Sequence, residues 1–145
     1  MRREIILQGI ATAIALLFCY AALSKLTNFA TSRSEMLNQV FPESIALILV
    51  WVVPITELFI VALLLYKPLR LMGFYASLIL LSLFTIYIAI TMTGVFGRIP
   101  CSCGGILKHM SYSVHLIFNV FFLLLALAGI LLKRNMTINS HISLN

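Results

Sequence analysis

Two long apolar runs joined by a dipeptide decide the fold of this chain. Residues 44–66 read SIALILVWVVPITELFIVALLLY, and after Lys67-Pro68 residues 69–92 read LRLMGFYASLILLSLFTIYIAITM. Each run is longer than the roughly 20 residues with which a helix crosses the hydrocarbon core of a bilayer. Because the connection is so short, the two runs predict a membrane-spanning hairpin of antiparallel helices.

Two further runs, residues 5–23 and 114–132, approach the same length and extend the pattern to four spans. The chain of 145 residues is 62% hydrophobic and 10% charged, and its mean hydropathy is +1.11. This composition excludes a water-soluble globular domain. We therefore expect an all-α membrane protein, an antiparallel four-transmembrane-helix bundle that forms a single domain over residues 1–134, followed by a polar, disordered cytoplasmic tail at 135–145.

The first run follows two arginines and has a removable signal sequence as its alternative. A lipoprotein signal needs a small residue before its cysteine, but Phe18 precedes Cys19. We expect the segment to remain as the first helix.

The connection between the first two spans predicts a short amphipathic helix at the membrane surface. Ser32-Arg33-Ser34-Glu35 has the spacing of a capping box, and Pro42 would end the helix. Apolar residues follow on one side: Met36, Leu37, Val40 and Phe41. Such a helix anchors the protein at the interface or, alternatively, covers a site beneath it.

The basic residues of the connections predict the orientation, because positive charge is retained on the cytoplasmic side. With the N-terminus inside, that side holds six: Arg2, Arg3, Lys67, Arg70, Lys133 and Arg134. The other side holds four: Lys25, Arg33, Arg98 and Lys108. We expect both termini in the cytoplasm of a bacterium, a multi-pass protein of the inner membrane, and the third connection in the periplasm. Anionic lipid accounts for the net charge of +6, so no nucleic-acid partner is expected.

The third connection carries the strongest chemical signal, the Cys101-Ser102-Cys103 pair. Outside the cytoplasm, paired thiols become oxidised or exchange with other thiols. A disulfide within Cys-x-Cys is strained and so is easily reduced. Nearby positive charge (Arg98, Lys108 and His109) favours the reactive thiolate form. The pattern predicts a thiol–disulfide exchange site at Cys101 and Cys103, supported by His109, and leaves open which cysteine attacks.

Two alternatives remain for the same pair. The disulfide could be a structural staple in a non-catalytic membrane subunit. The thiols could also bind Cu(I), together with His109, Met110 or Met92. A zinc site needs four ligands and would lack one here, and overall we expect no metal site.

Three residues within the spans are candidates for supporting roles. Glu57 is the only carboxylate in the interior of a span, where an ionised group must be paired or neutralised. We expect it to be protonated and bonded to a hydroxyl group (Ser77, Ser82 or Thr12), to take part in proton transfer, or to clasp two helices. Lys25 is expected to extend to the outer interface; the alternative is a distant counter-ion of Glu57, although the difference in depth argues against contact. Cys19, about one and a half turns before Lys25, either relays a disulfide inward or packs as an apolar side chain.

His115 and Asn119 are four residues apart and therefore share a face at the outer end of the last span. They form either a polar cluster at the helix end or part of a site for a quinone head group. A quinone is thus the one cofactor that the sequence leaves open.

Three segments together resemble the MauE branch of the DoxX-like membrane protein family. They are Tyr20-Ala21-Ala22-Leu23-Ser24-Lys25-Leu26, Pro54-Ile55-Thr56-Glu57-Leu58 and Cys101-Ser102-Cys103-Gly104-Gly105. The resemblance covers residues 5 to 132. Family members usually continue the cysteine pair with a phenylalanine-glycine turn, whereas this chain has Gly104-Gly105.

The resemblance implies a redox-associated inner-membrane protein of methylamine utilisation. Such proteins are thought to form or maintain disulfides in a periplasmic dehydrogenase subunit, alongside a thioredoxin-like partner. The implied redox role falls on Cys101 and Cys103 alone. Disulfide-bond-forming enzymes of similar architecture use Cys-x-x-Cys, which this chain lacks.

Overall fold

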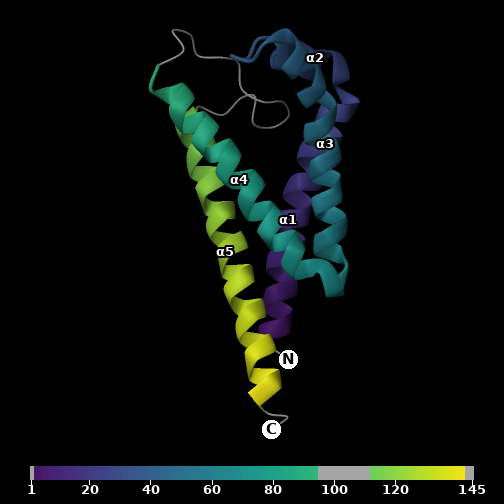
Figure 1. Ribbon diagram of the computed structural model, residues 1–145, viewed down its shortest axis with the longest axis vertical. Coiled ribbons are helices and arrows are strands. Elements are labelled where there is room, and N and C mark those ends of the chain that lie inside the picture. The colour runs from purple at the N-terminus through teal and green to yellow at the C-terminus, as the bar shows by residue number, and fades with distance from the viewer. Residues whose placement is uncertain (1, 95–111, 143–145) are drawn as a thin grey trace.

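A computed structural model of the chain describes residues 2–94 and 112–142, and every regular element within those ranges is helical (Figure 1). The elements in chain order are α1 (Arg2–Thr27), α2 (Phe29–Leu37), α3 (Glu43–Leu65), η1 (Lys67–Leu69), α4 (Arg70–Met92) and α5 (Tyr112–Ile142). The predicted fold class, four long helices with a short helix after the first, is confirmed.

Four of the helices are long and apolar enough to cross a membrane: Arg2–Thr27, Glu43–Leu65, Lys67–Met92 and Ser113–Met136. Three of them include a whole predicted span, and the second ends at Leu65, one residue before the predicted end at Tyr66. The prediction of a disordered tail after Arg134 is wrong as far as Ile142, because α5 continues to that residue. No glycine or proline follows Gly129, so nothing in the sequence stops the helix there.

The four long helices form a ring in which each one packs against two neighbours. The most extensive contacts are α1 with α3 and α4 with α5, and contacts of α3 with α4 and α1 with α5 close the ring. The single turn of η1 joins α3 to α4, so the predicted antiparallel hairpin is confirmed. Both termini lie at one end of the bundle and α2 lies at the other (Figure 1).

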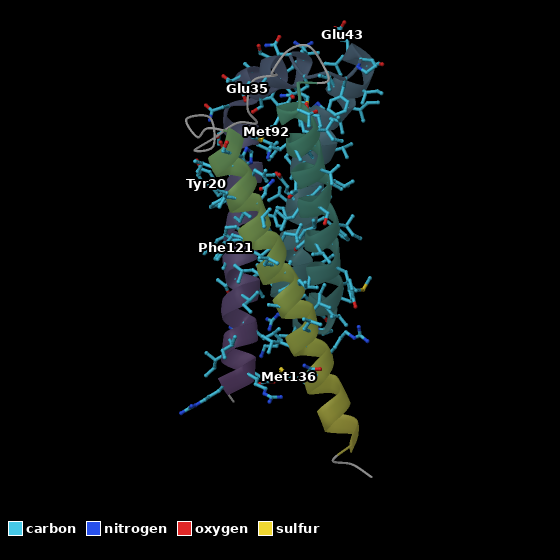
Figure 2. All side chains as sticks on the ribbon, turned by 90° about the vertical axis from the view of Figure 1, so that its left-hand side faces the viewer. Tyr20, Glu35, Glu43, Met92, Phe121 and Met136 are labelled. Atoms are coloured by element: carbon cyan, nitrogen blue, oxygen red, sulfur yellow. The ribbon has the colours of Figure 1, made fainter. Side chains whose placement is uncertain are left out.

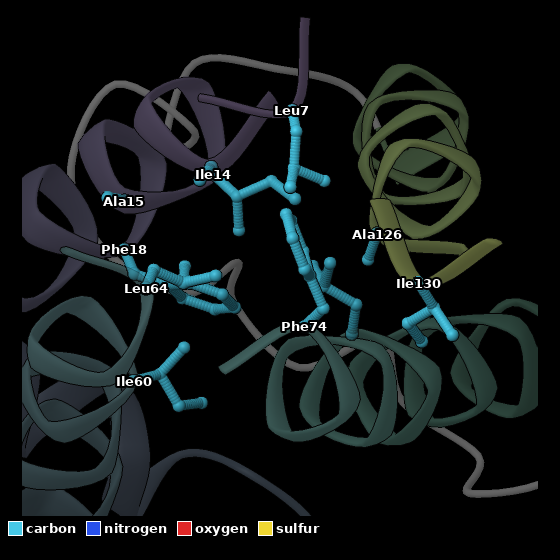
Figure 3. Packing of buried hydrophobic residues seen from close by; sticks show 11 residues of the cluster. Leu7, Ile14, Ala15, Phe18, Ile60, Leu64, Phe74, Ala126 and Ile130 are labelled. Carbon is cyan, nitrogen blue, oxygen red and sulfur yellow. The ribbon is translucent and has the colours of Figure 1, made fainter. Parts of the chain in front are cut away.

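The centre of the bundle is a cluster of apolar side chains from all four long helices. Figure 3 shows Ile14 of α1, Ile60 of α3, Phe74 of α4 and Ile130 of α5 directed into the space between the ribbons. Large apolar residues also cover the outside of the bundle, among them Ile48, Phe59, Ile79 and Ile117. A surface this apolar requires lipid as its solvent.

The prediction for α2 is correct in its existence and wrong in its boundaries. The helix begins at Phe29 rather than at a Ser32 cap, and the backbone N–H of Ser32 donates to the carbonyl of Asn28 at 2.9 Å. Because that N–H is already bonded within the helix, Ser32 is an interior residue and no capping box forms. The helix also ends at Leu37, before Pro42. It packs against α3, where Phe29 and Trp51 place their ring centroids 4.7 Å apart.

Two glycines allow close contact between helices. A Cβ on Gly73 would lie 2.9 Å from the backbone nitrogen of Leu64, and a Cβ on Gly129 would lie 2.5 Å from the buried ring of Phe74. Both distances are shorter than a van der Waals contact, so a larger residue must push elements apart. Gly9 provides a matched control, because a Cβ there meets nothing within 4 Å.

We expect Gly73→Ala and Gly129→Ala each to lower the free energy of unfolding by about 1–3 kcal/mol, the usual effect of overpacking. Gly9→Ala should be neutral or stabilising by up to about 1 kcal/mol, because alanine favours the helix. Unfolding by sodium dodecyl sulfate in mixed micelles measures all three. Equal effects at Gly73 and Gly9 would contradict the close packing of α3 and α4.

Candidate functional site

An ion pair between α1 and α3 lies in the half of the bundle nearer α2, close to the C-terminal end of α1. The Nζ atom of Lys25 donates hydrogen bonds to Oε1 of Glu57 at 2.8 Å and to Oε2 at 3.1 Å. The side chain of Glu57 is 1% exposed and that of Lys25 is 13% exposed. The pair is therefore largely withdrawn from both water and lipid.

This contact overturns the expectation that Lys25 and Glu57 differ too much in depth to meet. In any helix the side chains lean toward its N-terminus. Since α1 and α3 are antiparallel, Lys25 leans into the bundle and Glu57 leans toward the end where α2 lies, so the two approach each other. The four-carbon stem of lysine covers the remaining distance.

The expected hydroxyl partners of Glu57 are also corrected. Ser77 donates to the carbonyl oxygen of Gly73 at 2.7 Å, and Ser82 donates to that of Leu78 at 2.7 Å, so both bond within their own helix. Thr12 is exposed. Of the roles considered for Glu57, the clasp between helices is the one that its contacts display.

A cavity of about 170 Å³ lies beside the ion pair. Most of its walls are apolar or aromatic, and polar side chains interrupt them, among them Lys25, Glu57, His115 and Asn119. The other lining residues come from α1, α2, α3, α4 and α5, and are Leu17, Phe18, Tyr20, Ala21, Met36, Val53, Leu81, Phe84, Tyr87, Ile88 and Phe118. All five α-helices that the structure describes thus contribute to this cavity.

His115 and Asn119 lie on one face of α5, as their spacing predicts, and both line the cavity. They are 7% and 4% exposed. The Nδ2 atom of Asn119 is buried and has no hydrogen-bond partner among the described residues. A buried amide group normally finds such a partner, so this donor marks a place where a bound molecule could supply one.

One end of the cavity is covered by α2 and the chain that follows it. Met36 lines the cavity, and the hydroxyl of Tyr87 in α4 donates to Oε1 of Gln39. The rings of Phe41 and Tyr87 stack at a centroid distance of 5.4 Å. These contacts favour the interpretation of α2 as a cover over a site, the alternative to a purely interfacial anchor.

Sequence reasoning found Lys25, Glu57, His115 and Asn119 but missed Gln39 and Tyr87. Gln39 follows a short helix and Tyr87 lies within an apolar span, 48 residues further on. The hydroxyl of Tyr87 within an apolar span was the only signal in the sequence, and it did not indicate that Gln39 would be its partner.

Of the three cysteines, the structure describes only Cys19. Cys101 and Cys103 lie outside the described residues, as does His109, so their proposed roles stay predictions. Cys19 is a partly buried free thiol of α1 and is not among the residues that line the cavity. Within residues 2–94 and 112–142, no three His, Cys, Asp or Glu side chains gather as a metal site would require.

Comparison with known proteins identifies one family. The model of the family described as "Methylamine utilisation protein MauE" matches residues 3–132, which includes all four spans and the cysteine pair. Neither a search of the curated proteins nor a search of the solved structures finds a match.

Proposed function

Because this chain belongs to the MauE family of methylamine utilisation proteins, we propose that Cys101 and Cys103 form a dithiol that exchanges disulfides with a thioredoxin-like protein outside the cytoplasm. This chain, a multi-pass membrane protein associated with methylamine utilisation, would then maintain the thiols of another protein of that pathway. In this proposal the membrane is the bacterial inner membrane, with both termini in the cytoplasm.

The position of the cysteine pair in the chain is the observation that carries the proposal. The pair belongs to the connection between Met92, where α4 ends, and Tyr112, where α5 begins. Both helix ends lie away from the chain termini, at the end of the bundle where α2 also lies (Figure 1). In the proposal, this end faces the side of the membrane opposite the termini, where the cysteine pair would meet soluble partners.

The exchange proceeds through two substitutions at sulfur. In the oxidising direction, a thiolate of the partner attacks the Cys101–Cys103 disulfide and forms a mixed disulfide, and the partner's second thiolate then releases the reduced pair. Two electrons and two protons pass from the partner to this protein. In the reducing direction the same steps run backwards, and one cysteine of the pair attacks while the other resolves the mixed disulfide.

A mixed disulfide is the intermediate that tests the proposal. Of the two variants Cys101→Ser and Cys103→Ser, one retains the attacking thiol and lacks the resolving thiol. We expect that variant to accumulate a covalent complex with an added oxidised thioredoxin-like protein. Non-reducing electrophoresis detects the complex, and a reductant should dissolve it. Cys19→Ser, with both loop thiols present, is the control and should accumulate none.

The absence of a complex in both single variants, under conditions where the added protein reacts with small thiols, would contradict exchange. It would favour the alternative of a non-catalytic membrane subunit.

A further inference from the structure

We propose that the cavity between the helices binds a lipid-soluble quinone, with the amide of Asn119 donating a hydrogen bond to a carbonyl oxygen of the quinone ring. Three properties of the cavity support this ligand class: its volume, the unpaired donor of Asn119 and a wall residue that is also exposed on the outside of the bundle. Together they select a small ring that carries a hydrogen-bond acceptor and arrives through the membrane.

The volume suits a single ring. An empty protein cavity of about 150 Å³ is sufficient to hold a benzene molecule. At about 170 Å³, this cavity has room for one six-membered ring with small substituents. The rings of Phe18, Phe84 and Phe118 line it and can pack against a flat ligand by offset or edge-to-face contacts.

The polar groups suit an acceptor. The Nδ2 atom of Asn119 is a buried donor with no partner in the described part of the chain, and binding an acceptor would remove the cost of that unmade hydrogen bond. His115, one turn away on the same wall, adds a second polar side chain. The carboxylate of Glu57 is already paired with Lys25, so it does not repel an electron-rich carbonyl as a free charge would.

A quinone would enter the cavity from the lipid. Tyr20 lines the cavity and is also 43% exposed on the outside of α1 (Figure 2). The outside of α1 would face the bilayer, so the side chain of Tyr20 separates this part of the cavity from the lipid in which an isoprenoid tail would lie. An acyl chain could enter by the same route but has no acceptor for Asn119.

A bound quinone would also complete the electron balance of the thiol chemistry, a role that rests on the proposed function. Oxidation of Cys101 and Cys103 to a disulfide releases two electrons and two protons, and a quinone that takes up both becomes a quinol. One quinone is therefore consumed for each disulfide formed.

Binding is tested on the full chain in detergent, in a Cys101→Ser, Cys103→Ser background that cannot reduce the ligand. The probe is decylubiquinone, a benzoquinone with a short apolar tail, and equilibrium dialysis measures its affinity. We expect saturable binding at one molecule per chain, and we expect Asn119→Leu to weaken it about tenfold by removing the donor. Without quinone, Asn119→Leu should unfold at the same or a higher temperature, because it removes an unsatisfied buried group.

Ser77→Ala is the control. Ser77 is fully buried, bonds only within α4 and does not line the cavity, so its loss should leave the affinity unchanged. No saturable binding, or equal affinity in the Asn119→Leu and parent proteins, would overturn the proposal and leave the cavity to lipid. Intact binding combined with a failure of thiol exchange would contradict only the proposed function.

Discussion

Replacing both Cys101 and Cys103 with serine is expected to abolish thiol–disulfide exchange while leaving the bundle folded. Serine cannot form a disulfide, so the variant has neither the attacking nor the resolving group. The measurement is the rate at which membranes containing the protein change the redox state of an added thioredoxin-like protein. We expect the rate to fall to that of membranes without the protein.

Cys19→Ser separates the two sets of thiols. Cys19 does not line the cavity, and it is a partly buried residue of α1. We expect Cys19→Ser to retain most of the exchange rate. A rate that survives loss of the loop pair but disappears in Cys19→Ser would assign the chemistry to the first helix instead.

Replacing Lys25 with methionine is expected to have the largest effect on stability. It leaves the carboxylate of Glu57, 1% exposed, without its partner inside the bundle. Breaking a buried ion pair by removing one member typically costs about 3–5 kcal/mol, because the remaining charge has lost its compensation. Unfolding by sodium dodecyl sulfate in mixed micelles should show a decrease in this range.

Glu57→Leu and the double variant provide the matched controls. Lys25 lies in the last turn of α1 and is 13% exposed, so it can turn outward to water when Glu57 is gone. We therefore expect Glu57→Leu to destabilise less than Lys25→Met, and Lys25→Met combined with Glu57→Leu to recover much of the loss. Additive losses in the double variant would show that the two residues are not energetically coupled.

The spans and the hairpin could be predicted from the sequence because they depend on local properties. Apolar length sets where a helix can cross the membrane, and a two-residue connection sets which helices are neighbours. The prediction of where α2 starts was wrong for a related reason. Ser32 and Glu35 have the spacing of a capping box, but the chain becomes helical again at Phe29, before Ser32. A motif that is four residues long does not reveal where the preceding turn begins.

The contacts between helices could be predicted only in part. His115 and Asn119 share a face because they are one turn apart on one helix, and the cavity contains both. The Lys25–Glu57 pair joins residues 32 apart, and the pair between Gln39 and Tyr87 joins residues 48 apart. Such pairs depend on how antiparallel helices pack and how their side chains lean, which a pattern along one chain does not contain.

The redox state of Cys101 and Cys103 in membranes tests the central claim most directly. The membranes are equilibrated in a series of thiol–disulfide buffers, and a membrane-impermeant alkylating tag that adds mass then counts the free thiols on the outer side. We expect a reversible couple of two thiols that are labelled from the side opposite the termini. A pair that stays oxidised in strongly reducing buffer, or that the tag never reaches from outside, would contradict exchange and leave a structural disulfide in a membrane bundle.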